Sequence, residues 1–146
     1  MRKQQKTLIQ IAKHAPQIEN FKELIDYHAT VKTINPYAFA VCLLPHSGSI
    51  AKEVSAFLSS KGTKMPIEEL NFDGLRQHNL EDFINQLRIK RREFETKEAT
   101  EIHLFIAGPI MSGVLIGAEF DNWKPVKLYH QNRDTKQYEF WCPLTK

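Results

Sequence analysis

Two short segments carry the residues that are best suited to contact a polar or anionic ligand. They are Pro45–Ser49 and Gly108–Ser112, and each leads directly into a helical pattern. A helix start offers free backbone N–H groups and the positive end of the helix dipole, both of which favour an anion. Glycine and serine also let a ligand approach the main chain closely. The candidate contact residues are Pro45, His46, Ser47, Gly48, Ala107, Gly108, Pro109, Met111, Ser112 and Gly113.

A purely steric role for these small residues is the alternative, because tight strand-to-helix turns need Gly and Ser in any case. A third group of candidates follows the strand pattern Val126–Gln131. Tyr129 could stack on a base, while the amides of Gln131 and Asn132 could read a base edge. The alternative for this third group is the solvated end of a hairpin.

Residues suited to catalysis are sparse. His46 lies in the first loop and could act as a ligand donor or as a general acid or base. Ser47 and Ser112 could neighbour it, but no acidic residue is placed to orient the imidazole. The sequence contains no carboxylate pair, G-x-S-x-G elbow, H-E-x-x-H or Walker loop, and GPIMSG is not a dinucleotide-binding fingerprint. Binding is therefore favoured over chemistry, and no catalytic residue, cofactor or metal is predicted.

The elements that position these loops alternate between strand and helix. From Ala38 onward the order is strand–helix–strand–helix–strand–helix–strand–strand, which predicts a three-layer, Rossmann-like α/β fold. The sheet is expected to be mostly parallel, with an antiparallel C-terminal hairpin, and to be preceded by N-terminal helices. The predicted strands are Ala38–Leu44, Ile67–Phe72, Ile102–Ala107, Val126–Gln131 and Gln137–Trp141.

The strand order decides which loops meet. In open α/β sheets, ligands bind beyond the carboxyl ends of the strands, where the strand order reverses. With the order second–first–third–fourth, that point lies between the strands ending at Leu44 and Ala107, beside both candidate loops. The helix after the second loop is predicted to begin at Pro109. Its predicted buried face comprises Ile110, Val114, Leu115 and Ala118.

Size and composition indicate an ordinary globular protein. The 146 residues are expected to form one domain, with a helical segment over 1–35 and a Rossmann-like core over 36–146. The sequence shows no secretion signal and no apolar stretch of the roughly 18 residues that a membrane span needs. Cys42 and Cys142 form no C-x-x-C pair, and we expect both to be buried in a protein of the reducing cytoplasm. The net charge of +3 permits an anionic ligand but does not favour bulk nucleic acid.

The segment Glu101–Leu144 resembles the C-terminal part of SAVED domains, the sensor modules of bacterial anti-phage CBASS and type III CRISPR systems. The resemblance rests on IHLFIAGP, a helix ending in LIGAEF, then PVKLYHQN and a tyrosine-bearing last strand, QYEFW. In that family an I-H-L-F strand leads into an A-x-P turn, and a V-x-x-Y strand precedes the final strand. The matching positions here are Ile102–Phe105, Ala107–Pro109, Gly117, Val126–Tyr129 and Tyr138.

SAVED domains look like two fused CARF-type units that bind cyclic oligonucleotide second messengers. The resemblance therefore implies a sensor of such a messenger, with contacts from Ala107–Gly113 and Tyr129–Asn132. Because this chain accommodates one unit, a second copy of the chain or a partner effector is expected to complete it.

Two other functions stay open beside the sensor. One is a ring-nuclease-like enzyme that cleaves a cyclic oligonucleotide with His46 and Ser47. The other is a noncatalytic assembly subunit whose predicted helices over Lys6–Tyr27 pack on a partner.

Overall fold

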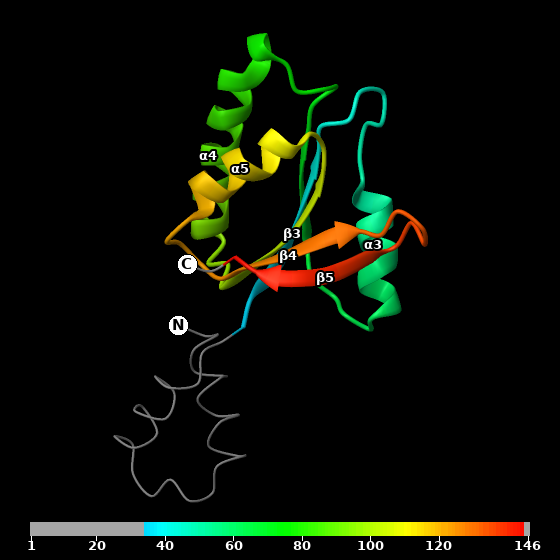
Figure 1. The fold of residues 1–146 in the computed structure, drawn as a ribbon. Coiled ribbons are helices and arrows are strands. Elements are labelled where there is room, and N and C mark those ends of the chain that lie inside the picture. Colours follow the sequence, from blue (N-terminus) through cyan, green and yellow to red (C-terminus); the bar gives the residue numbers. More distant parts are fainter. Residues whose placement is uncertain (1–33, 145–146) are drawn as a thin grey trace, which may run out of the picture. The chain divides into compact units, whose positions relative to one another are not determined.

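Alternating strands and helices build the part of the chain that the computed structural model describes, residues 34–144 (Figure 1). The helices predicted before Asn35 lie outside the described residues. The elements, in chain order, are β1 (Pro36–Cys42), α3 (Ala51–Ser60), β2 (Ile67–Asn71), the 3-10 turn η1 (Gln77–Asn79), α4 (Leu80–Thr96), β3 (Glu101–Ala107), α5 (Ile110–Phe120), β4 (Val126–Gln131) and β5 (Tyr138–Pro143).

The five strands form one sheet in the order β2-β1-β3-β4-β5. The pairs β1–β2, β1–β3 and β3–β4 are parallel, and β4–β5 is an antiparallel hairpin. The predicted mostly parallel sheet, its strand order and its C-terminal hairpin are therefore confirmed. The order reverses between β1 and β3, because the chain builds outward from β1 to β2 and then returns to the other side of β1.

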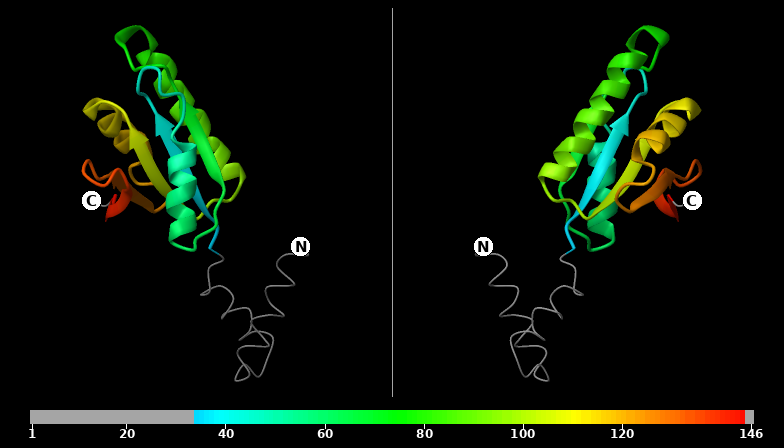
Figure 2. Two further views of the ribbon diagram at one scale, coloured as in Figure 1. Left: turned by 90° about the vertical axis from the view of Figure 1, so that its right-hand side faces the viewer. Right: turned by 90° about the vertical axis from the view of Figure 1, so that its left-hand side faces the viewer.

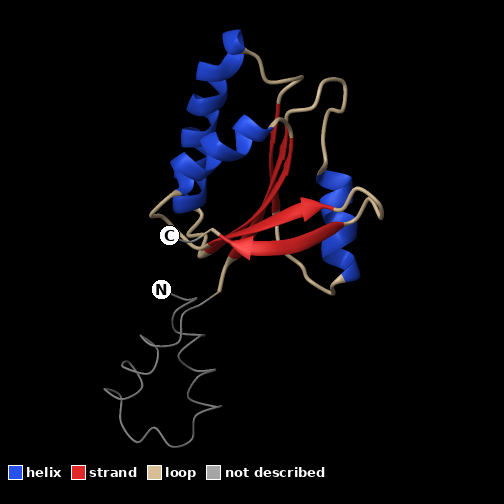
Figure 3. Ribbon diagram, viewed as in Figure 1, coloured by secondary structure: helices blue, strands red, loops and turns tan. Residues whose placement is uncertain are grey.

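Helices cover both faces of this sheet, which makes three layers (Figures 2 and 3). Helix α3 packs on one face, where its Val54 and Leu58 meet Ala38, Ala40 and Cys42 of β1. Helices α4 and α5 pack on the other face. There the alternate residues of β1 and the helices form a second cluster that includes Phe39, Val41, Phe83, Leu87, Phe94, Ile116 and Phe120. Strand β1 is thus buried on both sides, as its continuous apolar sequence predicts.

Helix α5 differs from its predicted orientation. Its buried residues are Ser112, Ile116 and Phe120, whereas Ile110 and Val114 of the predicted face are 91% and 69% exposed. The prediction of the buried face was wrong because nearly every position of this helix is apolar or small, so its periodicity does not single out one side. The aromatic ring of Phe120, 5.8 Å from that of Phe39, fixes the side that faces the sheet.

The start of β1 also differs by two residues from the predicted strand. The strand begins at Pro36, whose missing N–H is harmless at the first position of a strand. The N–H of Asn35 donates to Thr100 Oγ1 at 2.6 Å and ties this end to the loop before β3. Cys42 is buried as expected, and Cys142 is only partly covered. Among the helices of residues 34–144, none combines the length and apolar character that crossing a bilayer demands.

Candidate functional site

The carboxyl ends of β1 and β3 lie side by side at the point where the strand order reverses. Cys42 pairs with Ala107, and the N–H of Leu43 donates to the carbonyl of Ala107 at 2.7 Å. Gly108 follows directly, and a Cβ placed there would lie 3.0 Å from Leu43 Cβ. The structure therefore brings the starts of both candidate loops together, and close packing accounts for the glycine. We refer to the two loops, Pro45–Ser49 and Gly108–Ser112, as the strand-end region.

The first loop is held by groups at the end of β2. The backbone N–H of His46 donates to Asp73 Oδ1 at 2.7 Å, and His46 adopts a left-handed conformation with φ of 63°. A non-glycine residue in this conformation is uncommon. The His46 side chain is exposed, as are Pro45, Ser47 and Gly48. Asp73 was not predicted from the sequence as a residue that supports this loop.

The second loop has both accessible and buried members. Ser112 is fully buried, and its hydroxyl donates to the carbonyl of Pro109 at 2.5 Å. Its predicted contact with a ligand would require that hydroxyl to be released. Met111 is 54% exposed in the first turn of α5, and no side chain caps the start of this helix. The first turn therefore presents backbone N–H groups beside the exposed residues Gly108, Pro109 and Gly113.

The third group of predicted contacts is divided by the structure. The amide of Gln131 donates to the carbonyl of Lys136 at 2.9 Å, and Asn132 Oδ1 accepts the N–H of Asp134 at 2.8 Å. Both amides thus close the β4–β5 hairpin. Tyr129 instead points to the face covered by α3, where its hydroxyl meets His103. Base recognition by these residues stays a prediction.

Glu101, His103 and Tyr129 form a hydrogen-bonded chain across β3 and β4. His103 Nε2 lies 2.5 Å from Glu101 Oε1, and His103 Nδ1 lies 2.7 Å from the Tyr129 hydroxyl. Because a carboxylate only accepts, Nε2 carries the proton, so the neutral ring accepts the Tyr129 O–H at Nδ1. Lys127 completes the cluster, 3.3 Å from Glu101. His103 is therefore a buried core residue with both ring nitrogens hydrogen-bonded.

Burial and charge act on each pKa in this chain. Burial lowers the pKa of His103, and this outweighs the hydrogen bond to Glu101, which acts in the opposite direction. Burial raises the pKa of Glu101, but the hydrogen bonds and charges of His103 and Lys127 leave it below its ordinary value. Burial, with a contribution from Glu101, raises the pKa of Tyr129. At neutral pH the chain therefore holds an ionised Glu101 and a neutral His103.

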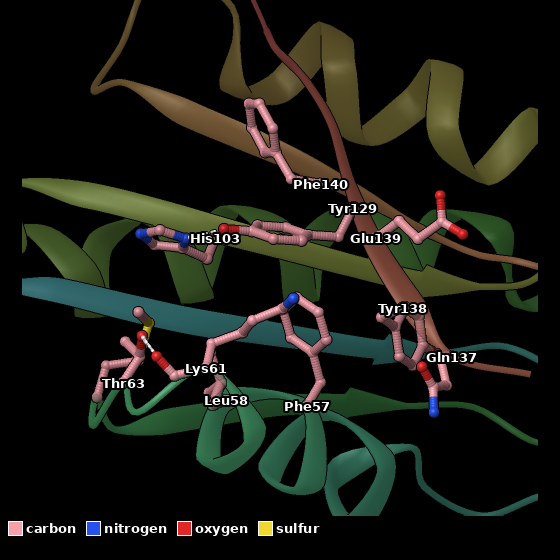
Figure 4. Close-up of a pocket in the computed structure, with 11 residues that line it drawn as sticks. Phe57, Leu58, Lys61, Thr63, His103, Tyr129, Gln137, Tyr138, Glu139 and Phe140 are labelled. Carbon is pink, nitrogen blue, oxygen red and sulfur yellow. Dashed lines mark hydrogen bonds between the residues drawn. The ribbon is translucent and has the colours of Figure 1, made fainter.

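A pocket of about 400 Å³ opens beside this chain, between α3 and the β4–β5 hairpin (Figure 4). Phe57 reaches up from α3, while Tyr129 and His103 lie along the sheet side of the pocket. Phe57 and Tyr129 meet edge to face with centroids 5.6 Å apart. The sequence alone does not predict this pocket, because Phe57 lies on a helix and the other aromatic lining residues come from strands distant in the sequence. In the described part of the chain, no three potential metal ligands converge.

Comparison with known proteins adds a family and a fold. The model of the SAVED family, described as "SMODS-associated and fused to various effectors sensor domain", matches residues 13–144. No curated protein sequence matches the chain.

Similar solved structures include the Acinetobacter baumannii Cap4 SAVED/CARF-domain containing receptor with the cyclic trinucleotide 2'3'3'-cAAA. It aligns at a TM-score of 0.60 and 16% identity over 77% of this chain. The same receptor described without a ligand aligns at 0.60 and 14% identity over 79% of this chain. With 3'3'3'-cAAA it aligns at 0.56 and 15% identity over 79%. The chain spans about a quarter of these receptor chains, 26%, 26% and 24%.

Proposed function

Because the chain belongs to the SAVED family of sensor domains, we propose that it binds a cyclic oligonucleotide second messenger in bacterial anti-phage defence. The resemblance noted in the sequence is confirmed by the match over residues 13–144, and the fold is that of SAVED/CARF receptors. The similar Cap4 receptor is described with bound cyclic trinucleotides, which supports a ligand of this class here. We place this sensor in the cytoplasm, within a CBASS or type III CRISPR system.

The observation that carries the proposal is the junction of β1 and β3. There the 2.7 Å bond between Leu43 and Ala107 holds two helix-leading loops next to each other. A cyclic oligonucleotide is a ring of phosphates and bases, so it needs an anion site with room for planar groups. The uncapped start of α5 supplies oriented N–H groups, and exposed Met111 supplies an apolar surface beside them.

Substitution of Met111 tests this placement. Met111 occupies the second position of α5, where a glutamate interacts favourably with the helix dipole and leaves the fold intact. M111E places a carboxylate against the phosphates, and we expect it to weaken the binding of 2'3'3'-cAAA or a related messenger by about tenfold or more. M111Q has a similar size without the charge and is expected to retain binding. Isothermal titration and the ligand-induced rise in Tm give the readout.

Two results would count against the proposal. Absence of any Tm shift across cyclic di-, tri- and tetranucleotides would contradict messenger sensing itself. Equal binding by M111E and the unmodified chain would contradict the strand-end region as the site. Signalling is proposed to proceed through oligomerisation or through a partner effector chain.

A further inference from the structure

The surface between α3 and β5 contains a second concave region, separate from the two strand-end loops. The pocket beside His103 adjoins another of about 290 Å³, and the two share Phe57, Lys61, Gln137 and Tyr138 as lining residues. We call this continuous surface the α3–β5 groove. None of its four shared residues belongs to Pro45–Ser49 or Gly108–Ser112.

Aromatic side chains dominate the deeper part of the groove. Phe57 comes from α3, Tyr129 from β4, and Tyr138 and Phe140 from β5. Tyr138 is nearly buried and meets the Phe105 ring edge to face at 5.3 Å, so its position is fixed. Phe140 is half exposed at the rim. Rings held in place in this way present a surface on which a planar ring can stack with little loss of side-chain entropy.

Charged and polar groups surround the shallower part. The Lys61 ammonium lies 5.8 Å from the centre of the Phe57 ring and extends across the groove (Figure 4). Neither Lys61 nor Lys136 has a carboxylate within ion-pair distance among residues 34–144. The side-chain amide of Gln137 makes no hydrogen bond within the same residues. Glu53 is the opposing charge that lines the groove beside Lys61.

The second acidic side chain of the groove is already engaged elsewhere. Glu139 accepts a hydrogen bond from the Asn132 amide at 2.7 Å and lies 3.8 Å from His130 Nε2. Within the described residues, the groove therefore combines aromatic rings, an amide without a hydrogen-bond partner and two ammonium groups without an ion pair. This set matches a ligand with a planar heterocycle, a hydrogen-bonding edge and a phosphate.

We propose that the α3–β5 groove is a second ligand site that binds a nucleotide, its base against Phe57 and Tyr129 and its phosphate at Lys61 and Lys136. The Gln137 amide is placed to bond the edge of the base. A free nucleotide and one nucleotide unit of a cyclic messenger share this chemistry. The site stands on its own contacts and does not depend on a messenger at the strand-end region.

Adenosine 5'-monophosphate is the probe, titrated into the full chain by calorimetry and by amide NMR shifts. We expect saturable binding in the millimolar range. K61Q should weaken this binding about three- to fivefold, since it removes one exposed ion pair between Lys61 and the phosphate of the nucleotide. K52Q removes an exposed lysine from the same helix outside the groove and should leave affinity unchanged. E53Q removes the opposing carboxylate and should strengthen binding about twofold.

A further variant tests the aromatic part of the α3–β5 groove. F57L keeps an apolar side chain in the cluster under α3 but removes the stacking ring, and it should weaken binding about tenfold. An unchanged Tm for K61Q and E53Q keeps the test valid even if F57L folds poorly. Absence of binding at about 10 mM nucleotide, or equal affinity in K61Q, E53Q and the unmodified chain, would overturn the proposal.

Further titrations separate the sources of the nucleotide and the two sites. Adenosine and inorganic phosphate alone should each bind more weakly than the monophosphate. If 2'3'3'-cAAA displaces the monophosphate and also binds K61Q less tightly, the groove holds part of the messenger; if it does neither, the groove takes a free nucleotide. M111E should leave binding of the monophosphate unchanged. Binding of the monophosphate without binding of any messenger would contradict the proposed function and would still support the nucleotide site in the α3–β5 groove.

Discussion

At the residue scale, the hydroxyl of Tyr129 has a defined structural role. It donates to the buried Nδ1 of His103, whose other nitrogen is committed to Glu101. Y129F keeps the ring that stacks on Phe105 at 4.4 Å but leaves that acceptor without a donor. We expect the free energy of unfolding to fall by about 1–2 kcal/mol, measured by urea denaturation. Y138F is the matched control and should cost less, since the structure records no hydrogen bond from the Tyr138 hydroxyl within the described residues. Equal losses in the two variants would contradict this role.

His103 also predicts how stability depends on pH. Burial holds its pKa in the folded chain below the ordinary value of 6.5, so between these two values the unfolded chain binds a proton that the folded chain does not. Stability is therefore complete above pH 6.5 and falls as the pH drops through this window, by at most about 1.4 kcal/mol per pH unit. The lowered pKa of Glu101 acts only below its ordinary 4.5.

Denaturation curves from pH 7.5 to 5.5 measure this effect. H103Q is the control, because its amide can donate to Glu101 and accept from Tyr129 without titrating. We expect the free energy of unfolding to fall with decreasing pH in the unmodified chain and to stay constant in H103Q. An identical slope in both would assign the pH dependence to other groups.

Single residues also mark the limit of what the sequence could predict about the candidate sites. The loop residues could be selected because they follow a predicted strand and precede a predicted helix, where backbone N–H groups are free to meet a ligand. The buried state of Ser112 could not be predicted from the sequence, since it depends on a hydrogen bond to Pro109 and on which side of α5 faces the sheet. The pocket beside His103 brings Phe57 next to Tyr138, and no local pattern reports so distant a contact.

At the element scale, the glycines of α5 and its preceding turn have opposite roles. Nothing lies within 4 Å of a Cβ placed at Gly113 or Gly117 inside the helix. G113A and G117A should each stabilise the fold by about 0.5–1 kcal/mol, because alanine has the higher helix propensity. G108A should destabilise it by about 1–3 kcal/mol, since the new methyl would lie 3.0 Å from Leu43 Cβ.

Urea denaturation of the three variants checks this contrast. Destabilisation by G117A would show that the open space beside Gly117 is filled in solution. Stabilisation by G108A would show that the β1–β3 junction is looser than the structure records.

The elements themselves were largely predictable from sequence. A buried strand such as β1 has a continuous apolar run, and α4 has an amphipathic pattern with the buried residues Phe83, Leu87 and Phe94 at helical spacing. These patterns report burial directly. Helix α5 is the exception, since a helix that is apolar on most sides carries no signal for the side that faces the sheet. The start of β1 lies two residues before the predicted Ala38, because a residue pair that ends in proline, such as Asn35-Pro36, is more typical of the end of a helix than of the start of a strand.

At the scale of the whole molecule, the chain matches about a quarter of the length of the similar solved receptor chains. An apolar surface on α5, with Ile110 and Val114, is exposed in the described residues. If signalling proceeds through oligomerisation, we expect the molar mass measured by light scattering to increase when 2'3'3'-cAAA is added. A mass that stays constant at saturating ligand would leave a partner effector as the route.

The two edges of the described sheet differ in how readily they could accept another strand. Edge strand β2 carries Glu68, and the hydrogen bond from Lys97, offset in part by burial and reinforced by Lys90, keeps its pKa low and the carboxylate charged. A charged edge resists pairing with a foreign strand, since pairing would strip water from those charges. Edge strand β5 exposes Phe140 and Trp141 instead, with Glu139 as its one carboxylate and Pro143 at its end. Misassembly of this protein by sheet extension would therefore start at β5, and that strand is where a gatekeeper charge would do most to keep concentrated samples soluble.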